Sequence, residues 1–211
     1  SEAVNLVSAD DFVLTKTGTA NGFIGTPTTT DNITWEIIIN TITGDGTLRL
    51  DLKEATDIQD FAGNSEPLSK IGDDVHTSDF TNPTFDSASS IPNHNGNNFS
   101  ASANIVMAFS EDIVLGTNNV VIREVATNTI IEDFDVTENN TGSSNPGAGE
   151  IGIAGRFLYI NPTEDLVADG REYAIRMNPN AIDDLYGNSF AGMSNNSFYS
   201  FSTALIATWT G

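Results

Sequence analysis

Apolar and polar residues alternate along many short segments of this chain, and helical spacing is almost absent. A period of two places apolar side chains on one face of a strand, as in an antiparallel sheet that is covered on one side. Segments rich in Gly, Asn, Asp, Pro and Ser separate these runs and are typical of turns. The pattern therefore predicts an all-β sandwich. The clearest predicted strands are 12–14, 33–42, 48–52, 105–109, 120–125, 130–136, 157–160, 173–177 and 198–201.

The chain contains an internal repeat. The frame Ile-x-Asp-x-x-Gly-Asn-Ser starts at Ile58 and again at Ile182, and Ser-Glu followed by an apolar segment occurs upstream of both, at 1–4 and 110–113. The second copy is longer between these marks, which indicates an insertion, and the Asn/Gly/Ser-rich stretch 139–149 is a natural place for it. A repeat of this kind predicts two tandem modules. We place them at 1–82 and 83–203, followed by a strand-like tail at 204–211.

The first module lacks the leading strands of the second. In the second copy a strand-like segment, 104–109, precedes the Ser-Glu mark, whereas the first copy begins at the mark itself. A sandwich without about two strands exposes apolar core and unpaired backbone, so another segment must fill the gap.

Two sources for that segment are open. The strands either precede Ser1 in the same polypeptide, in which case the tail opens a following domain, or they come from an identical subunit. The tail places Leu205, Ala207 and Trp209 on one face at a period of two. Such a strand is suited to addition to an incomplete module of the next subunit, which would build a filament head to tail.

Charge and composition exclude several classes of function. The 211 residues include 8 Lys and Arg against 29 Asp and Glu, a formal net charge of −21. So few basic residues cannot form a phosphate-binding surface, which argues against nucleic acid as a partner. No apolar run is long enough to insert this segment into a membrane. The absence of cysteine excludes disulfides, thiol catalysis and iron–sulfur sites, while 38% hydrophobic residues support a packed core.

The second module resembles the bacterial immunoglobulin-like domains that occur in tandem in surface-layer proteins and very long adhesins. The resemblance implies two tandem immunoglobulin-like β-sandwiches, the first without its leading strands, in an extracellular protein of the cell surface. Such domains act mostly as rigid, non-enzymatic spacers, and several related extracellular repeats bind calcium. The matching segments are 109–113 (Phe-Ser-Glu-Asp-Ile), 158–160 with Pro162, 166–170 leading to 173–175, 184–188 (Asp-x-x-Gly-Asn) and 198–203.

Two sets of acidic residues are candidate calcium ligands. Asp60 with Asn64, and Asp184 with Asn188, offer the oxygen atoms that calcium prefers, although Asp, Gly and Asn at this spacing also form a turn that caps its own backbone. The other set lies between the modules, where Glu111 or Asp112 could share an ion and stiffen the joint; the alternative is a solvated acidic linker. The acidic residues between the modules are Asp73, Asp74 and Asp79.

No catalytic constellation stands out. His76 and His94 are the only imidazoles, and neither has a partner at metal-binding spacing. No Gly-x-Ser-x-Gly segment frames a nucleophile. We therefore expect a structural or adhesive segment whose partners are neighbouring modules or identical subunits. The alternatives are a module that recognises a surface glycan or protein through loops at one end of the sandwich, or an accessory domain of a secreted polysaccharide-degrading enzyme.

Overall fold

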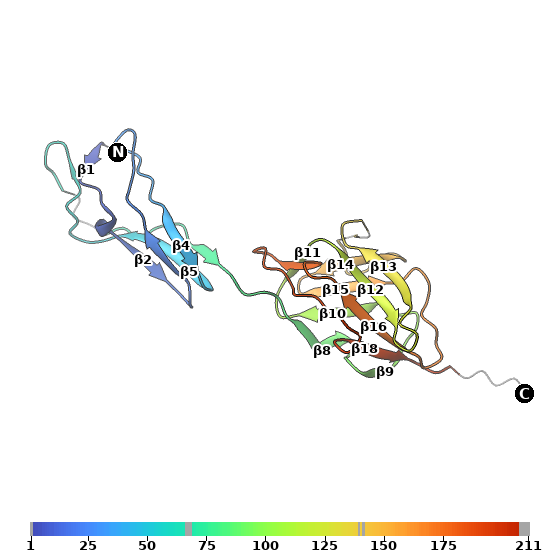
Figure 1. Cartoon of the computed structure of the whole chain (residues 1–211). Helices are drawn as coiled ribbons and strands as arrows, with labels where there is room; N and C mark the ends of the chain where they lie inside the picture. Colours follow the sequence, from blue (N-terminus) through green and yellow to red (C-terminus); the bar gives the residue numbers. More distant parts are fainter. Residues whose placement is uncertain (1, 66–68, 139, 141, 207–211) are drawn as a thin grey trace, which may run out of the picture. The chain divides into compact units, whose positions relative to one another are not determined.

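The computed structural model describes residues 2–65, 69–138, 140 and 142–206 (Figure 1). The chain divides into two compact units, Ser1–Thr81 and Asn82–Gly211. The boundary lies one residue before the one placed from the sequence. The described elements are strands, apart from one 3-10 turn at Ala9–Asp11, so the expected all-β class is confirmed. Across the described residues, no helix has the length and apolar character needed to span a membrane.

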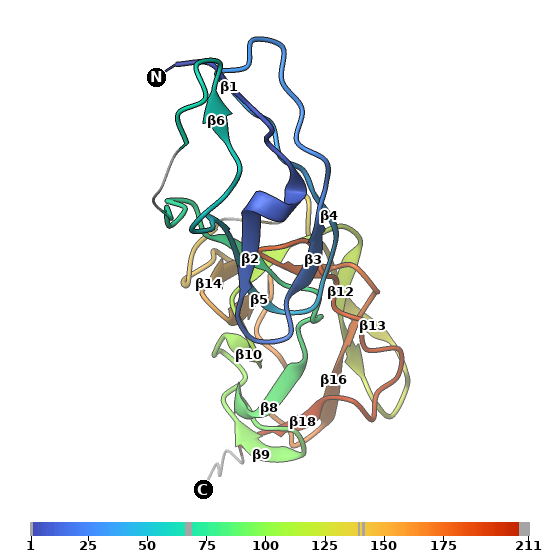
Figure 2. The same ribbon diagram turned by 90° about the vertical axis from the view of Figure 1, so that its left-hand side faces the viewer.

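The second unit is built from two main sheets. One sheet has the order β14-β15-β10-β8 and the other the order β13-β12-β16-β18-β9, while β11 and β17 form a separate antiparallel pair. All neighbours are antiparallel except β18 and β9, which run parallel and lie side by side in both views (Figures 1 and 2). The strands are β8 (Phe85–Ile91), β9 (Gly96–Phe99), β10 (Ile105–Phe109), β11 (Ile113–Leu115), β12 (Asn119–Glu124), β13 (Ile130–Asp135), β14 (Glu150–Ala154), β15 (Phe157–Asn161), β16 (Glu172–Met177), β17 (Ile182–Asp184) and β18 (Ser200–Thr203).

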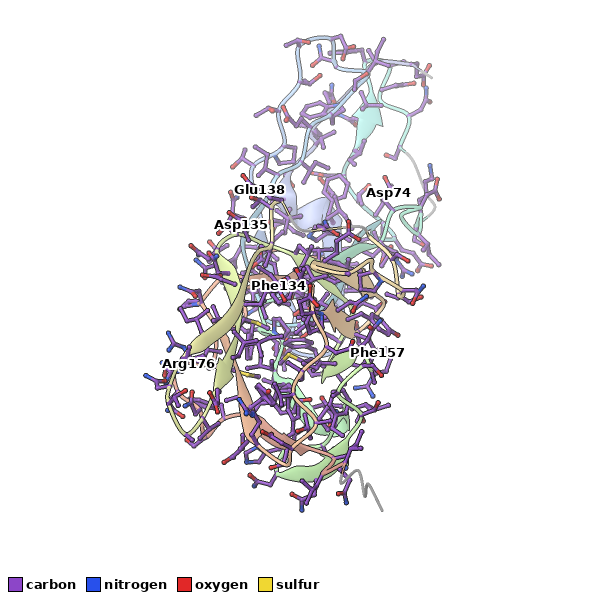
Figure 3. All side chains as sticks on the ribbon, turned by 90° about the vertical axis from the view of Figure 1, so that its right-hand side faces the viewer. Asp74, Phe134, Asp135, Glu138, Phe157 and Arg176 are labelled. Carbon is purple, nitrogen blue, oxygen red and sulfur yellow. The ribbon has the colours of Figure 1, made fainter. Side chains whose placement is uncertain are left out.

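The core of the second unit follows the alternation in the sequence. Ile105, Met107 and Phe109 of β10 are fully buried, whereas Val106 between them is only half-buried. Strands of both sheets contribute to one hydrophobic cluster. Phe134 of β13 is fully buried among the densely packed side chains of this unit (Figure 3). This unit is therefore a closed two-layer sandwich.

The first unit contains fewer strands and buries much less apolar surface. Its sheets have the orders β2-β5-β7, β3-β4 and β1-β6. Among its described residues, the buried hydrophobic side chains are those of Ala20, Leu48 and Ile58. The strands are β1 (Val4–Asn5), β2 (Phe12–Lys16), β3 (Asn21–Ile24), β4 (Ile39–Thr43), β5 (Gly46–Leu52), β6 (Gln59–Asp60) and β7 (His76–Ser78).

The structure of the first unit differs from the sequence expectation at 33–42. Only Ile39–Thr43 forms a strand there, and the preceding residues contribute a single bridge between Thr28 and Glu36. Ile33 and Ile38 are 50% and 57% exposed. Alternation alone does not produce a long strand where the apolar face has no opposing layer to pack against.

Candidate functional site

The repeated sequence marks are brought together in the same way in both units. β1 pairs with β6 so that Val4 lies opposite Asp60. β11 pairs with β17 so that Ile113 lies opposite Asp184. The strand that follows each Ser-Glu mark and the Asp-x-x-Gly-Asn frame are therefore neighbours in each unit, although more than 50 residues separate them along the chain.

Each frame forms a turn that its own side chains close. Oδ1 of Asp184 accepts hydrogen bonds from the backbone N–H groups of Tyr186 and Asn188, both at 2.8 Å. Its Oδ2 accepts one from Nδ2 of Asn188 at 2.7 Å. Gly187 has a φ of +88°, a conformation that favours glycine. The turn thus supplies a complete structural reason for Asp, Gly and Asn at these positions.

The turn of the first unit is built identically. Asp60 accepts hydrogen bonds from the backbone of Ala62 and Asn64 at 2.8 Å and from Nδ2 of Asn64 at 2.7 Å, and Gly63 has a φ of +87°. The side-chain hydrogen bond from Asn64, together with its backbone N–H, lowers the pKa of the Asp60 carboxyl group. The turn therefore favours an ionised Asp60, while Asp184 forms the same bonds in a buried position.

Two of the acidic residues named from the sequence come together in the second unit. Carboxylate oxygens of Glu111 and Asp184 lie within 4.8 Å of each other, with Asp184 buried and Glu111 half-buried. Asp79 is a half-buried residue of the first unit. Asp73 and Asp74 are exposed and belong to no such group in the described part of the chain. The grouping offers a cation several oxygen ligands, which is the chemistry that calcium requires.

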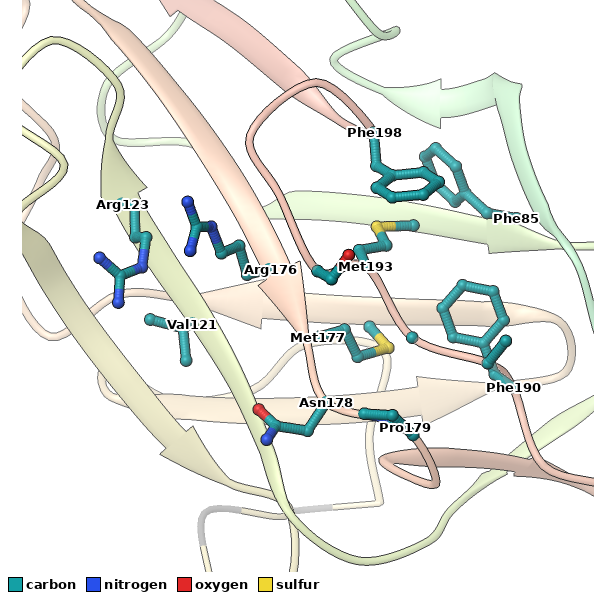
Figure 4. A pocket seen from close by; sticks show the side chains of 13 residues that line it. Phe85, Val121, Arg123, Arg176, Met177, Asn178, Pro179, Phe190, Met193 and Phe198 are labelled. Carbon is teal, nitrogen blue, oxygen red and sulfur yellow. The ribbon is translucent and has the colours of Figure 1, made fainter.

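The second unit also has a pocket of about 740 Å³ that the sequence did not reveal (Figure 4). Its signal in the sequence was one arginine near the end of each of two largely apolar strands, which is informative in a chain with so few basic residues. Two guanidinium groups lie at one side of the pocket and phenyl rings, among them those of Phe85 and Phe198, at the other, with methionine side chains between them (Figure 4). These residues are Arg123, Arg176, Phe85, Phe198, Met177 and Met193.

The first unit has an apolar hollow of about 320 Å³. Trp35 lines it, and the buried Nε1 of this residue has no hydrogen-bond partner. The apolar residues that line the hollow with Trp35 are Val4, Val7, Phe12, Leu50, Leu52 and Ile58. The hollow is the kind of surface that a further strand or side chain would cover.

The start of the tail lies beside the second unit. Leu205 forms a backbone bridge with Asp169, and the N–H of Ile206 donates to the carbonyl of Ala168 at 3.1 Å. The Leu205 side chain is 71% exposed, while Ala207 and Trp209 lie outside the described residues. Donation of the tail to another subunit stays a prediction.

Comparison with known proteins identifies the second unit. The family model described as bacterial Ig-like domain matches residues 79–203, more than half of the chain. Asp79, Glu111 and Asp184 all fall within that range, as does the pocket. No curated protein and no solved structure matches the chain.

Proposed function

Because the chain belongs to the family of bacterial Ig-like domains, we propose that it is a non-enzymatic structural segment of a bacterial extracellular surface protein. In this role the second unit is a rigid spacer within a stalk or fibre. Its continuous hydrophobic core and paired strands suit a module that keeps its shape. The net charge of −21 keeps such modules soluble and mutually repelled.

The observation that carries the proposal is the turn that occurs in both units. Asp60 and Asp184 make the same three hydrogen bonds, at matching distances, opposite the same position of the neighbouring strand. This likeness supports the inference that the first unit is a related module. Modules repeated in series are what a spacer requires, since its length grows with the number of modules.

The proposal is tested by locating the protein on the bacterium that makes it. Antibodies raised against this chain should label intact cells, and brief treatment of intact cells with a protease should remove the label. An antibody to a cytoplasmic protein serves as the control, because it should label cells only after lysis. Labelling by both antibodies only in lysed cells would contradict the surface role.

We propose further that the first unit is completed by an added strand. Its apolar hollow and its few buried side chains support this, because a strand laid there would cover Trp35 and its neighbours. The strand comes either from polypeptide adjoining this chain or from the tail of an identical subunit. Head-to-tail addition of the tail would build the filament expected from the sequence.

Sedimentation of the full chain over a range of concentrations separates these two sources. Donation by the tail predicts association that increases with concentration and is abolished by Leu205→Asp. Ile131→Asp adds the same charge at another exposed aliphatic residue and should leave association unchanged. A chain that stays monomeric at high concentration would exclude donation by the tail and leave the adjoining polypeptide as the source.

We propose calcium as the ion for the pair formed by Glu111 and Asp184. The closeness of the two carboxylates supports this, because a divalent cation would relieve their mutual repulsion. Calorimetric titration of the full chain with calcium should show binding that Glu111→Gln weakens, while Asp112→Asn, which lies outside the pair, should not weaken it. Binding to the native state must also raise the unfolding midpoint, so equal midpoints in calcium and in chelator would refute the proposal.

A further inference from the structure

The arginine pair of the pocket is created by the register of two neighbouring strands. Val121 of β12 lies opposite Arg176 of β16, and Arg123 lies opposite Ala174. Arg123 and Arg176 are therefore diagonal neighbours, within reach of each other for side chains of this length. Val120 and Ile122 of β12 point into the core, so the arginines lie on the opposite face of this sheet.

Neutral amides hold both guanidinium groups in place. Nη1 of Arg123 donates to the backbone O and to Oδ1 of Asn128, at 2.7 and 3.3 Å. Nη2 of Arg176 donates to the same Oδ1 at 3.2 Å, and its Nε donates to Oδ1 of Asn196 at 2.8 Å. Two positive charges thus converge on one carboxamide oxygen, in an arrangement that fixes their positions before any ligand arrives.

These two arginines differ from the other three of the chain in having no acidic partner. Arg49, Arg156 and Arg171 each form an ion pair with an Asp. Within the described residues, neither Arg123 nor Arg176 has a carboxylate at ion-pair distance, although the chain has 29 acidic residues. Adjacent like charges repel, and an anion bound between them would relieve that repulsion.

The remainder of the pocket is mostly apolar, and part of it is exposed. Phe198 is 52% exposed and lies beside Phe85, while Met177 and Met193, each 2% exposed, lie between the rings and the arginines (Figure 4). A volume of about 740 Å³ is within the range of small-molecule sites. The pocket therefore combines a place for one anionic group with an aromatic surface for a ring-shaped body.

We propose that this pocket binds a sugar that carries a single carboxylate, at the end of an otherwise neutral glycan. The guanidinium groups bind the carboxylate through charge-assisted hydrogen bonds, and the C–H face of the sugar ring packs on Phe198. A glycan with one charge is favoured over a polyanion, because the charge of −21 repels each further negative group. This recognition role goes beyond the spacer function and does not depend on it.

Titration of the full chain with N-acetylneuraminate and with glucuronate, followed by calorimetry and NMR, tests the proposal. At least one acidic sugar should bind saturably and more weakly at high salt, while glucose should not bind. Acetate should bind more weakly than the acidic sugar, because it lacks the ring. A peptide with a free C-terminal carboxylate is the third probe, and preferential binding of that peptide would overturn the assignment to sugars.

Variants distinguish the two halves of the pocket. Arg176→Gln should lower the affinity for the acidic sugar about tenfold to a hundredfold, which is the effect of losing hydrogen bonds from a charged group. Phe198→Ala, at an exposed residue, should lower the affinity for the sugar but not for acetate. Lys53→Gln removes the same charge in the first unit and should change nothing. Absence of saturable binding by either acidic sugar, or equal binding of glucose and glucuronate, would refute the proposal.

Discussion

Replacement of Tyr199 by Phe removes a single oxygen atom from the core of the second unit. Tyr199 is fully buried, and its hydroxyl group donates a 2.6 Å hydrogen bond to the carbonyl of Pro92. Its ring lies against Phe85 and Phe201, with centroid distances of 5.0 and 6.0 Å. The substitution leaves the ring contacts in place, so the change in the free energy of unfolding measures the contribution of the hydrogen bond.

At neutral pH the variant should be less stable by about 1 to 3 kcal/mol, because the buried carbonyl of Pro92 loses its partner. For a domain of this size the unfolding midpoint should fall by roughly 4 to 12 °C. Tyr159→Phe is the matched control, because Tyr159 is half-buried and its hydroxyl group forms no hydrogen bond within the described structure. We expect a change within about 0.5 kcal/mol for that control.

At alkaline pH the difference between Tyr199→Phe and the parent should shrink. Burial raises the pKa of Tyr199 in the folded state. The unfolded chain releases this proton near pH 10, so the stability due to Tyr199 is fully present below that pH and is lost as the pH rises above it. The variant does not lose stability through ionisation at position 199. Both proteins still lose the stability due to Tyr173, because burial also raises the pKa of that residue.

Urea denaturation followed by near-ultraviolet circular dichroism of tyrosine measures these effects, because all four tyrosines lie in the second unit. Curves at pH 7 and in steps up to pH 11 give the free energy of unfolding for each protein. Equal stability of variant and parent at pH 7, or a difference that grows with pH, would refute the reasoning.

Three further predictions concern the turns and the first unit. Asp184→Asn should cost about 1.5 to 3 kcal/mol in urea denaturation, because its new amide group would face the amide of Asn188 in place of an acceptor; no loss would contradict a structural turn. Gly187→Ala should cost about 1 to 2 kcal/mol from backbone strain alone, since no atom lies within 4 Å of the added methyl group; a larger loss would indicate a clash. The hydrogen bond from Arg49 lowers the pKa of Asp51, so the stability due to Asp51 should be present above about pH 4 and lost as the pH falls further. Tryptophan fluorescence between pH 6 and 2 measures this effect, and stability that rises on acidification would contradict it.

The sequence predicted the second unit well because two opposing sheets enforce its alternation. Ile105, Met107 and Phe109 are buried because each faces another layer. Ile33 and Ile38 belong to a segment with similar alternation, yet both are exposed and lie outside any strand. The alternation shows which side chains share a face, but it does not show whether another layer covers that face. Local signals were reliable where they depended on geometry within a few residues, as in the two Asp-x-x-Gly-Asn turns.

The arginine pair could not be predicted in the same way. Arg123 and Arg176 are far apart in the sequence, and only the register between β12 and β16 makes them neighbours. A shift of one residue would place their side chains on opposite faces of the sheet. The closeness of Glu111 and Asp184 was not predicted, because Glu111 was expected to share an ion with acidic residues between the modules, while Asp184 was assigned to its own turn.

The parallel pairing of β9 and β18 determines how the second unit responds to tension. β9 follows β8 near the start of this unit, and β18 lies near its end. Once the pairing of β8 with β10 has opened, a pull on the two ends of the unit therefore draws β9 and β18 in opposite directions along their common axis. Parallel neighbours loaded in this way slide past each other, and their hydrogen bonds bear the force together instead of opening one at a time. Resistance to force depends on the rate of unfolding under load. If the domain acts as the proposed spacer, shear along β9 and β18 would therefore let it hold its length under tension.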